Sequence, residues 1–132
     1  MTRHEKIEVR SSDDVVKVRQ RVRALAVEAG FSLVDQTKII TAASELARNT
    51  VNYGGGGHAI VSLVKSNGRT GLRLVFEDRG PGITDIELAM QDGYSTGAGL
   101  GLGLSGSRRL MHEFEIDSAP GQGTKVTVTR WR

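Results

Sequence analysis

The sequence contains no cysteine, no long apolar run and little excess charge. The lack of cysteine excludes disulfides, thiolate metal sites and a cysteine nucleophile. No apolar stretch approaches the roughly 18 residues that cross a bilayer, and residues 1–10 are charged where a signal peptide would be apolar. We therefore expect a cytoplasmic protein with no membrane partner.

The charge balance gives no indication of a nucleic-acid partner. The chain has 18 basic and 15 acidic side chains, a formal net charge of +3. This excess is too small to form the electrostatic footprint of a nucleic-acid-binding protein. We expect no nucleic acid among the partners, and we interpret the basic residues at 17–23 as the solvated side of a helix.

Length and patterning predict one folded domain over residues 1–132. The composition, 38% hydrophobic and 25% charged, is ordinary for a globular protein. The expected elements are a strand at 6–10, helices at 13–29 and 35–52, strands at 59–65 and 72–77, helices at 85–91 and about 102–113, and strands at 115–118 and 124–130. Asp35 is expected to cap the second helix, and Asn67-Gly68 to form a hairpin turn. Because the strands come in neighbouring pairs, we expect an α/β (α+β) two-layer sandwich, a mixed, largely antiparallel sheet with helices on one face.

Two polar side chains on the second predicted helix have a spacing that suits phosphoryl transfer. Glu45 and Asn49 stand four residues apart, so they lie on one face of the helix. A carboxylate can accept the proton of an attacking hydroxyl, and an amide oxygen can bind a hard cation such as Mg²⁺. The same pair also occurs on many solvated helix faces, so its meaning depends on the motifs that follow.

An acidic residue and two glycines, Asp78, Gly80 and Gly82, follow the strand predicted at 72–77. They are common turn residues. An ionised aspartate only accepts hydrogen bonds, so it also suits the exocyclic amine of adenine, and glycines let a flat base approach the backbone. Gly123-Thr124 precedes the last strand, where the Thr124 hydroxyl can reach the adenine edge.

Glycine alternates with alanine and then leucine through residues 97–104, a run that includes Gly99, Leu100, Gly101, Leu102 and Gly103. Free N–H groups at the start of the helix predicted to follow would bind phosphate. A dinucleotide fingerprint fails because the run does not follow the first strand of a βαβ unit, and a Walker A loop fails because no Gly-Lys-Ser/Thr is present. The regular leucines argue against a plain flexible linker, so we predict a phosphate-binding lid.

In their order along the chain, these four groups of residues resemble the motifs of the GHKL (Bergerat-fold) superfamily, which includes gyrase B, Hsp90, MutL, histidine kinases and anti-sigma kinases. The stretch from Glu45 to Asn49 is similar to its N box, and Asp78-x-Gly80-x-Gly82 to its G1 box. The glycines at 99, 101 and 103 are similar to its G2 box, and Gly123-Thr124 to its last glycine element. Within the superfamily, residues 41–49, 77–83, 92–96 and 130–132 look most like RsbT-type stressosome switch kinases, which are related to RsbW and SpoIIAB.

The resemblance implies an ATP-dependent serine/threonine kinase that uses Mg²⁺. Glu45 would be the general base, Asn49 would bind Mg²⁺ and nucleotide, and Asp78 would recognise adenine. The remaining nucleotide-binding positions would be Gly80, Gly82, Gly99, Leu100, Gly101, Leu102, Gly103 and Thr124.

The resemblance also implies partners. The phosphorylated substrates would be STAS-domain scaffold proteins, and the released kinase would bind a PP2C-type phosphatase or another output protein. Two other interpretations stay open: an ATP-gated binding module with little transfer activity, and an RsbW-like anti-sigma factor that binds a sigma factor directly. Arg48 stays unassigned among a phosphate, a partner and a neighbouring carboxylate.

Overall fold

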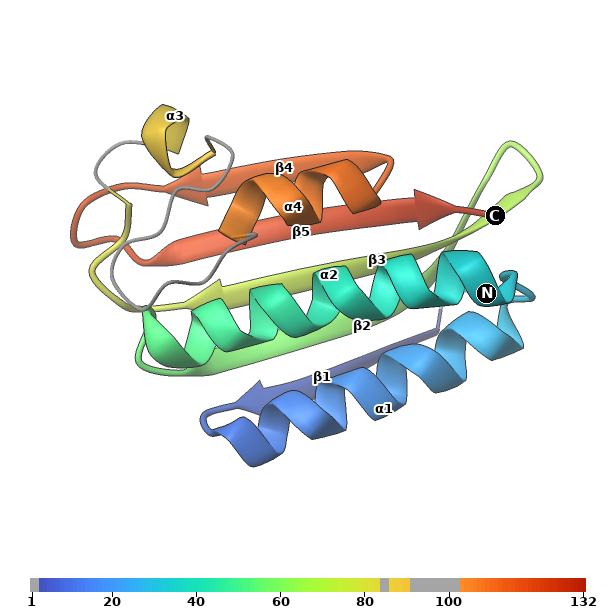
Figure 1. Ribbon diagram of the computed structural model, residues 1–132, viewed down its shortest axis with the longest axis horizontal. Coiled ribbons are helices and arrows are strands. Elements are labelled where there is room, and N and C mark those ends of the chain that lie inside the picture. Colours follow the sequence, from blue (N-terminus) through green and yellow to red (C-terminus); the bar gives the residue numbers. More distant parts are fainter. Residues whose placement is uncertain (1–2, 84–85, 91–102) are drawn as a thin grey trace.

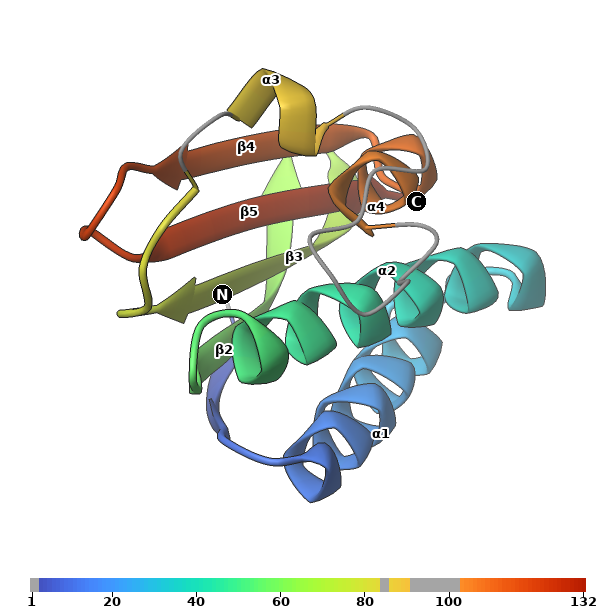
Figure 2. The same cartoon turned by 60° about the vertical axis from the view of Figure 1, so that its left-hand side comes forward.

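The computed structural model describes residues 3–83, 86–90 and 103–132. Their elements in chain order are β1 (Arg3–Val9), α1 (Ser12–Glu28), α2 (Leu33–Asn52), β2 (Gly57–Ser66), β3 (Arg69–Asp78), α3 (Ile86–Ala89), α4 (Gly103–Leu110), β4 (Glu113–Ser118) and β5 (Thr124–Trp131). The strands form one sheet in the order β1-β2-β3-β5-β4. Helices α1, α2 and α4 cover one face of this sheet (Figures 1 and 2).

The predicted two-layer sandwich with helices on one face is confirmed. All four neighbouring strand pairs among the described residues are antiparallel, so the parallel pairing that a mixed sheet would contain does not occur in this part of the chain. Asn67 and Gly68 both have positive φ, 51° and 77°, as the tight turn between β2 and β3 requires.

The core lies between the sheet and the helices. Strand residues of alternating sequence position point into it and are buried, as period-2 burial predicts. The fully buried larger side chains include Val9, Val61, Leu72, Leu74 and Val128 from the strands, and Val18, Val22, Leu25, Ile39 and Leu46 from the helices. Helix α2 is thereby fixed against the sheet along its length, which positions the polar residues on its other side.

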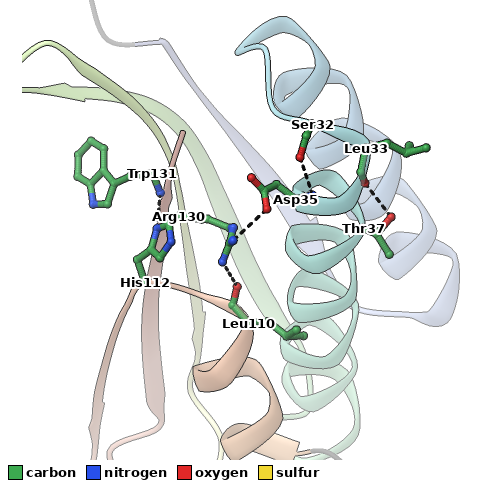
Figure 3. A network of polar contacts seen from close by, with 8 residues as sticks. All are labelled: Ser32, Leu33, Asp35, Thr37, Leu110, His112, Arg130 and Trp131. Carbon is green, nitrogen blue, oxygen red and sulfur yellow. Dashed lines mark hydrogen bonds and ion pairs between the residues drawn. The ribbon is translucent and has the colours of Figure 1, made fainter.

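The start of α2 differs from the prediction. The Ser32 hydroxyl accepts a hydrogen bond from the Asp35 N–H at 3.2 Å, so the helix begins at Leu33 and Asp35 falls in its first turn. Asp35 instead accepts a hydrogen bond from Arg130, as Figure 3 shows. Both residues have cap chemistry, but no local pattern indicates that a distant arginine would bind Asp35.

The end of α4 also differs from the prediction, because the helix stops at Leu110 instead of near Glu113. The His112 N–H already bonds to the Thr129 carbonyl of β5, and strand β4 follows at once. Phe114 and Ile116 alternate there with exposed carboxylates, a period of two that only a strand can place on one face. No described helix is both long and apolar enough to span a membrane.

Candidate active site

Glu45 and Asn49 lie on α2 with their neighbours Ala43, Leu46 and Ala47 turned into the core. The Glu45 side chain retains 12% of its exposure, so most of it is already withdrawn from water. The Asn49 Oδ1 atom is buried and has no hydrogen-bond partner among the described residues. A buried acceptor without a donor is destabilising, so this amide oxygen is suited to a ligand that brings positive charge.

Arg48, which the sequence left unassigned, forms an ion pair with Glu45. Its Nη2 donates to Glu45 Oε1, one turn away on the same helix. The Arg48 side chain is 40% exposed, much more than that of its partner. Of the three possible roles for Arg48, pairing with a neighbouring carboxylate is therefore the one seen in this structure.

Asp78 lies at the end of β3, where the strand opens into a loop. Its Oδ1 accepts the Gly80 N–H at 2.9 Å, and its register partner on β5 is Thr124. Burial raises the pKa of the Asp78 carboxyl, although N–H donors from Gly80 and Thr124 act in the opposite direction. Backbone donors thus hold the Asp78 carboxyl at the end of β3.

Glycines surround Asp78 so closely that a side chain would not fit. A Cβ on Gly54 would lie 2.3 Å from Asp78 Cγ, and one on Gly123 would lie 2.2 Å from the Asp78 carbonyl oxygen. A Cβ on Gly80 would lie 2.7 Å from the Gly54 Cα. At Gly80 the close neighbour is the Gly54 backbone, so glycine is needed there for the packing of the two loops.

Gly54 also connects the two halves of the site. Its N–H bonds to the Asn49 carbonyl at 3.1 Å, closing the C-terminal end of α2, and its Cα lies against Asp78. The sequence predicted only that the glycines at 54–57 would end the helix. Their contact with Asp78 was missed, because a stretch of glycines does not specify what will pack on it.

Ser118, also missed from the sequence, fixes the loop after β3 against the turn between β4 and β5. Its hydroxyl accepts the Ile83 N–H at 2.9 Å and lies 2.9 Å from both the Gly123 carbonyl and the Thr124 hydroxyl. The Gly121 N–H bonds to the Pro81 carbonyl at 2.7 Å across the same junction. Nothing local in the sequence links Ser118 with Ile83, 35 positions away.

Most of the predicted phosphate loop lies outside the described residues, namely Gly99, Leu100, Gly101 and Leu102. Gly103 is the first residue of α4. Leu104, the next residue, is buried in the core. Among the described residues, Gly54 connects the end of α2 with Asp78, and Asp78 pairs with Thr124 on β5.

A comparison with family models finds one match, over residues 34–131, to the family described as histidine kinase-, DNA gyrase B-, and HSP90-like ATPase. The chain is 48% identical to the serine/threonine-protein kinase RsbT of Bacillus subtilis (strain 168) over 89% of each chain. It is 31% identical to the anti-sigma F factor of Thermoanaerobacter sp. (strain X514), covering 86% of this chain and 82% of that one.

Solved structures show the same fold. The RsbU and RsbW domains of Rv1364c from Mycobacterium tuberculosis match with a TM-score of 0.65 and 21% identity, over all of this chain and 33% of that one. The mycobacterial sensor histidine kinase MprB matches with a TM-score of 0.57 and 19% identity, over 98% of this chain and 97% of that one. The chain therefore belongs to the histidine kinase-, DNA gyrase B- and HSP90-like ATPase family, with RsbT and the anti-sigma F factors among its relatives.

Proposed function

We propose that this chain is an ATP-dependent serine/threonine protein kinase. One observation carries the proposal: the buried Asn49 Oδ1, which has no partner among the described residues, lies one helical turn from Glu45, and the Asn49 backbone carbonyl is joined through Gly54 to the Asp78 loop. A proton acceptor, a cation ligand and a base-recognising carboxylate are the parts that phosphoryl transfer needs close together. The 48% identity to a serine/threonine-protein kinase over most of both chains supports the same activity.

In the proposed reaction, Glu45 accepts the proton of a serine or threonine hydroxyl on the substrate protein. The hydroxyl oxygen forms a bond to the γ-phosphorus of ATP while the bond from that phosphorus to the β,γ-bridging oxygen breaks. ADP leaves and the substrate carries the phosphate. Asn49 would hold Mg²⁺, whose charge would offset the negative charge that develops on the phosphates.

Asp78 binds the adenine amine in this proposal, with Thr124 beside it on β5 and Gly80 and Gly82 below the base. The structure supports it through the bonds that fix Asp78 and Thr124 at neighbouring strand ends. The glycines at 99, 101 and 103 are proposed to bind the phosphates on the strength of the motif alone.

We extend the proposal to partner switching by STAS-domain proteins. The support is the resemblance to RsbT-type kinases, together with the identity to RsbT itself. The substrate would be a STAS-domain scaffold, and the released kinase would bind a PP2C-type phosphatase or another output protein. A phosphate added to the scaffold brings about −1.5 to −2 charges to the contact, close to Glu45, which would favour release.

The test measures phosphate transfer from labelled ATP to purified STAS-domain proteins of the same cell. Glu45→Ala should lower the transfer rate by roughly 10²- to 10⁴-fold and leave ATP affinity intact, since the carboxylate acts on the hydroxyl and not on the nucleotide. Glu115→Ala, an exposed carboxylate on β4, is the control and should transfer normally. Normal transfer by Glu45→Ala would mean that another residue is the base. If neither the wild type nor the variants transfer phosphate, the chain would instead be an ATP-gated binding module.

Direct binding of a sigma factor is the second candidate, favoured by the 26–31% identity to several anti-sigma F factors. The two functions separate in one binding experiment. The purified chain with ADP or ATP is mixed with a STAS-domain protein and, separately, with sigma factors of the same cell. Capture of a sigma factor and of no STAS-domain protein would replace the proposed function with the second one.

A further inference from the structure

The proposed general base is not free in this structure. Glu45 Oε1 accepts a charge-assisted hydrogen bond from Arg48 Nη2, and the Glu45 side chain is largely withdrawn from water while the Arg48 side chain is 40% exposed. One carboxylate oxygen is therefore engaged before any substrate arrives. The inference that follows rests on the proposed role of Glu45.

Geometry makes Arg48 the mobile member of this pair. Glu45 has a short side chain held on a helix whose opposite face is fully buried. Arg48 has a longer side chain, a larger exposed fraction and five donors, so it can turn to another anion without disturbing the core. A phosphorylated or acidic group that enters the site would compete with Glu45 for the guanidinium.

We propose that Arg48 restrains the Glu45 carboxylate until the protein substrate has bound. Before the protein substrate binds, the guanidinium holds the carboxylate and keeps it from accepting a proton from water. When the substrate hydroxyl and the transferring phosphate are in place, Arg48 turns to the negative charge there and Glu45 is released to act. Arg48 is in this role a positioning residue that suppresses the loss of ATP to hydrolysis.

The reaction that this restraint suppresses is ATP hydrolysis. Water forms a bond from its oxygen to the γ-phosphorus of ATP, the bond from that phosphorus to the β,γ-bridging oxygen breaks, and the proton from water passes to Glu45. The products are ADP and inorganic phosphate. The proton acceptor and the leaving group are the same as in transfer, so control of when Glu45 is available would limit hydrolysis.

The experiment measures ATP hydrolysis by the full chain without any protein substrate. Arg48→Ala should hydrolyse ATP roughly fivefold faster than wild type, a change that corresponds to ~1 kcal/mol and to the upper end for a partly exposed ion pair. ATP affinity should not change. Arg48→Lys keeps the charge but not the forked geometry, so its rate should fall between the two.

Two further variants decide the cause. In the double variant Glu45→Ala/Arg48→Ala the increase should disappear, because no carboxylate is left to release. Arg21→Ala breaks a comparable arginine–carboxylate pair, with Glu5 on β1, and should leave hydrolysis at the wild-type rate. An Arg48→Ala rate equal to or below wild type would overturn the proposal, as would an increase that survives the loss of Glu45.

The outcome is separable from that of the proposed function. Hydrolysis needs only ATP and water, so the comparison between single and double variants stands even if no STAS-domain protein is phosphorylated. If transfer occurs but Arg48→Ala lowers transfer and hydrolysis together, Arg48 orients the base instead of restraining it. That result would leave the kinase proposal intact and would reject the proposed restraint of Glu45 by Arg48.

Discussion

The two ends of α2 place polar groups in opposite circumstances. At its start, Asp35 Oδ1 accepts from Arg130 Nη2 at 2.9 Å, and Arg130 Nη1 donates to the Leu110 carbonyl at 2.8 Å, so β5 ties the end of α4 to the beginning of α2 (Figure 3). We call Asp35, Arg130 and the Leu110 carbonyl the latch. At the other end of α2, Asn49 Oδ1 is buried with no partner among the residues that the structure describes, and the Asp78 carboxyl has a raised pKa.

The difference separates polar groups that stabilise the fold from polar groups reserved for ligands. The latch satisfies two of the three guanidinium nitrogens of Arg130, and only its Nε is buried without a partner. At the candidate active site Asn49 Oδ1 has no partner among the described residues, at a cost to stability that a bound nucleotide would offset. Substitutions at the two ends should therefore move stability and ligand affinity independently of each other.

The largest expected effect is on the fold of the site and comes from Gly123→Ala. Gly123 has φ +76° and its new Cβ would lie 2.2 Å from the Asp78 carbonyl oxygen, so both backbone strain and a steric clash are expected. Together they should cost roughly 2–5 kcal/mol of unfolding free energy and weaken ATP binding.

Gly121→Ala is the matched control for this substitution. Gly121 has the same φ of +76° in the same turn, but nothing lies within 4 Å of its added Cβ. Only strain remains, so the cost should be near ~1 kcal/mol, with ATP affinity preserved. Denaturant unfolding and ATP titration measure both. Equal losses in the two variants would mean that the approach of Gly123 to Asp78 has no energetic importance.

The second effect is on affinity and comes from Asp78→Asn. The amide has a single acceptor oxygen and is uncharged, so the hydrogen bond from the adenine amine loses its charged acceptor, and ATP and ADP should bind at least about tenfold more weakly. Because its pKa is raised, the folded protein takes up the Asp78 proton at higher pH than the unfolded chain does, so the ionised carboxyl opposes folding at neutral pH. The variant should therefore unfold at the same temperature or higher. Unchanged ADP affinity by calorimetry would remove Asp78 from the site.

The same comparison separates the features that the sequence predicts from those that depend on tertiary packing. The fold class, the strand and helix order, and the positions of Glu45, Asn49, Asp78 and Thr124 follow from periodicity and from motifs of fixed spacing, because local chemistry specifies them. The contact of Gly54 with Asp78 and the bond from Ile83 to Ser118 depend on tertiary packing between distant segments. The latch was missed for the same reason, since Asp35 and Arg130 stand 95 positions apart.

The third effect is on stability alone and comes from the latch. Asp35→Ala leaves the mostly buried Arg130 guanidinium without its carboxylate, so unfolding should become easier by about 1–2 kcal/mol, while ATP affinity stays within about twofold of wild type. Glu8→Ala removes an exposed carboxylate that lies 3.8 Å from Arg10 and should change neither quantity measurably. A marked loss of ATP affinity in Asp35→Ala would show that the two ends of α2 are coupled.

The smallest effect concerns pH and His112, which lies beside the latch. Its Nδ1 accepts the Trp131 N–H at 2.8 Å, as Figure 3 shows. Burial and the nearby guanidinium groups of Arg130 and Arg69 lower the pKa of His112 below its ordinary value of 6.5. The folded protein therefore resists a proton that the unfolded chain accepts, so stability rises with pH in this range.

The contribution of His112 should be complete above about pH 6.5 and should be lost progressively as the pH falls toward the lowered pKa of the folded state. His112→Gln keeps an acceptor for the Trp131 N–H but does not titrate, so its unfolding temperature should fall less than that of wild type between about pH 7.5 and about pH 5.5. His4→Gln, at an exposed histidine on β1, should follow wild type. If His112→Gln and wild type lose the same amount of stability on acidification, the titration of His112 does not act on the latch end, and the acid sensitivity of the fold arises from other groups.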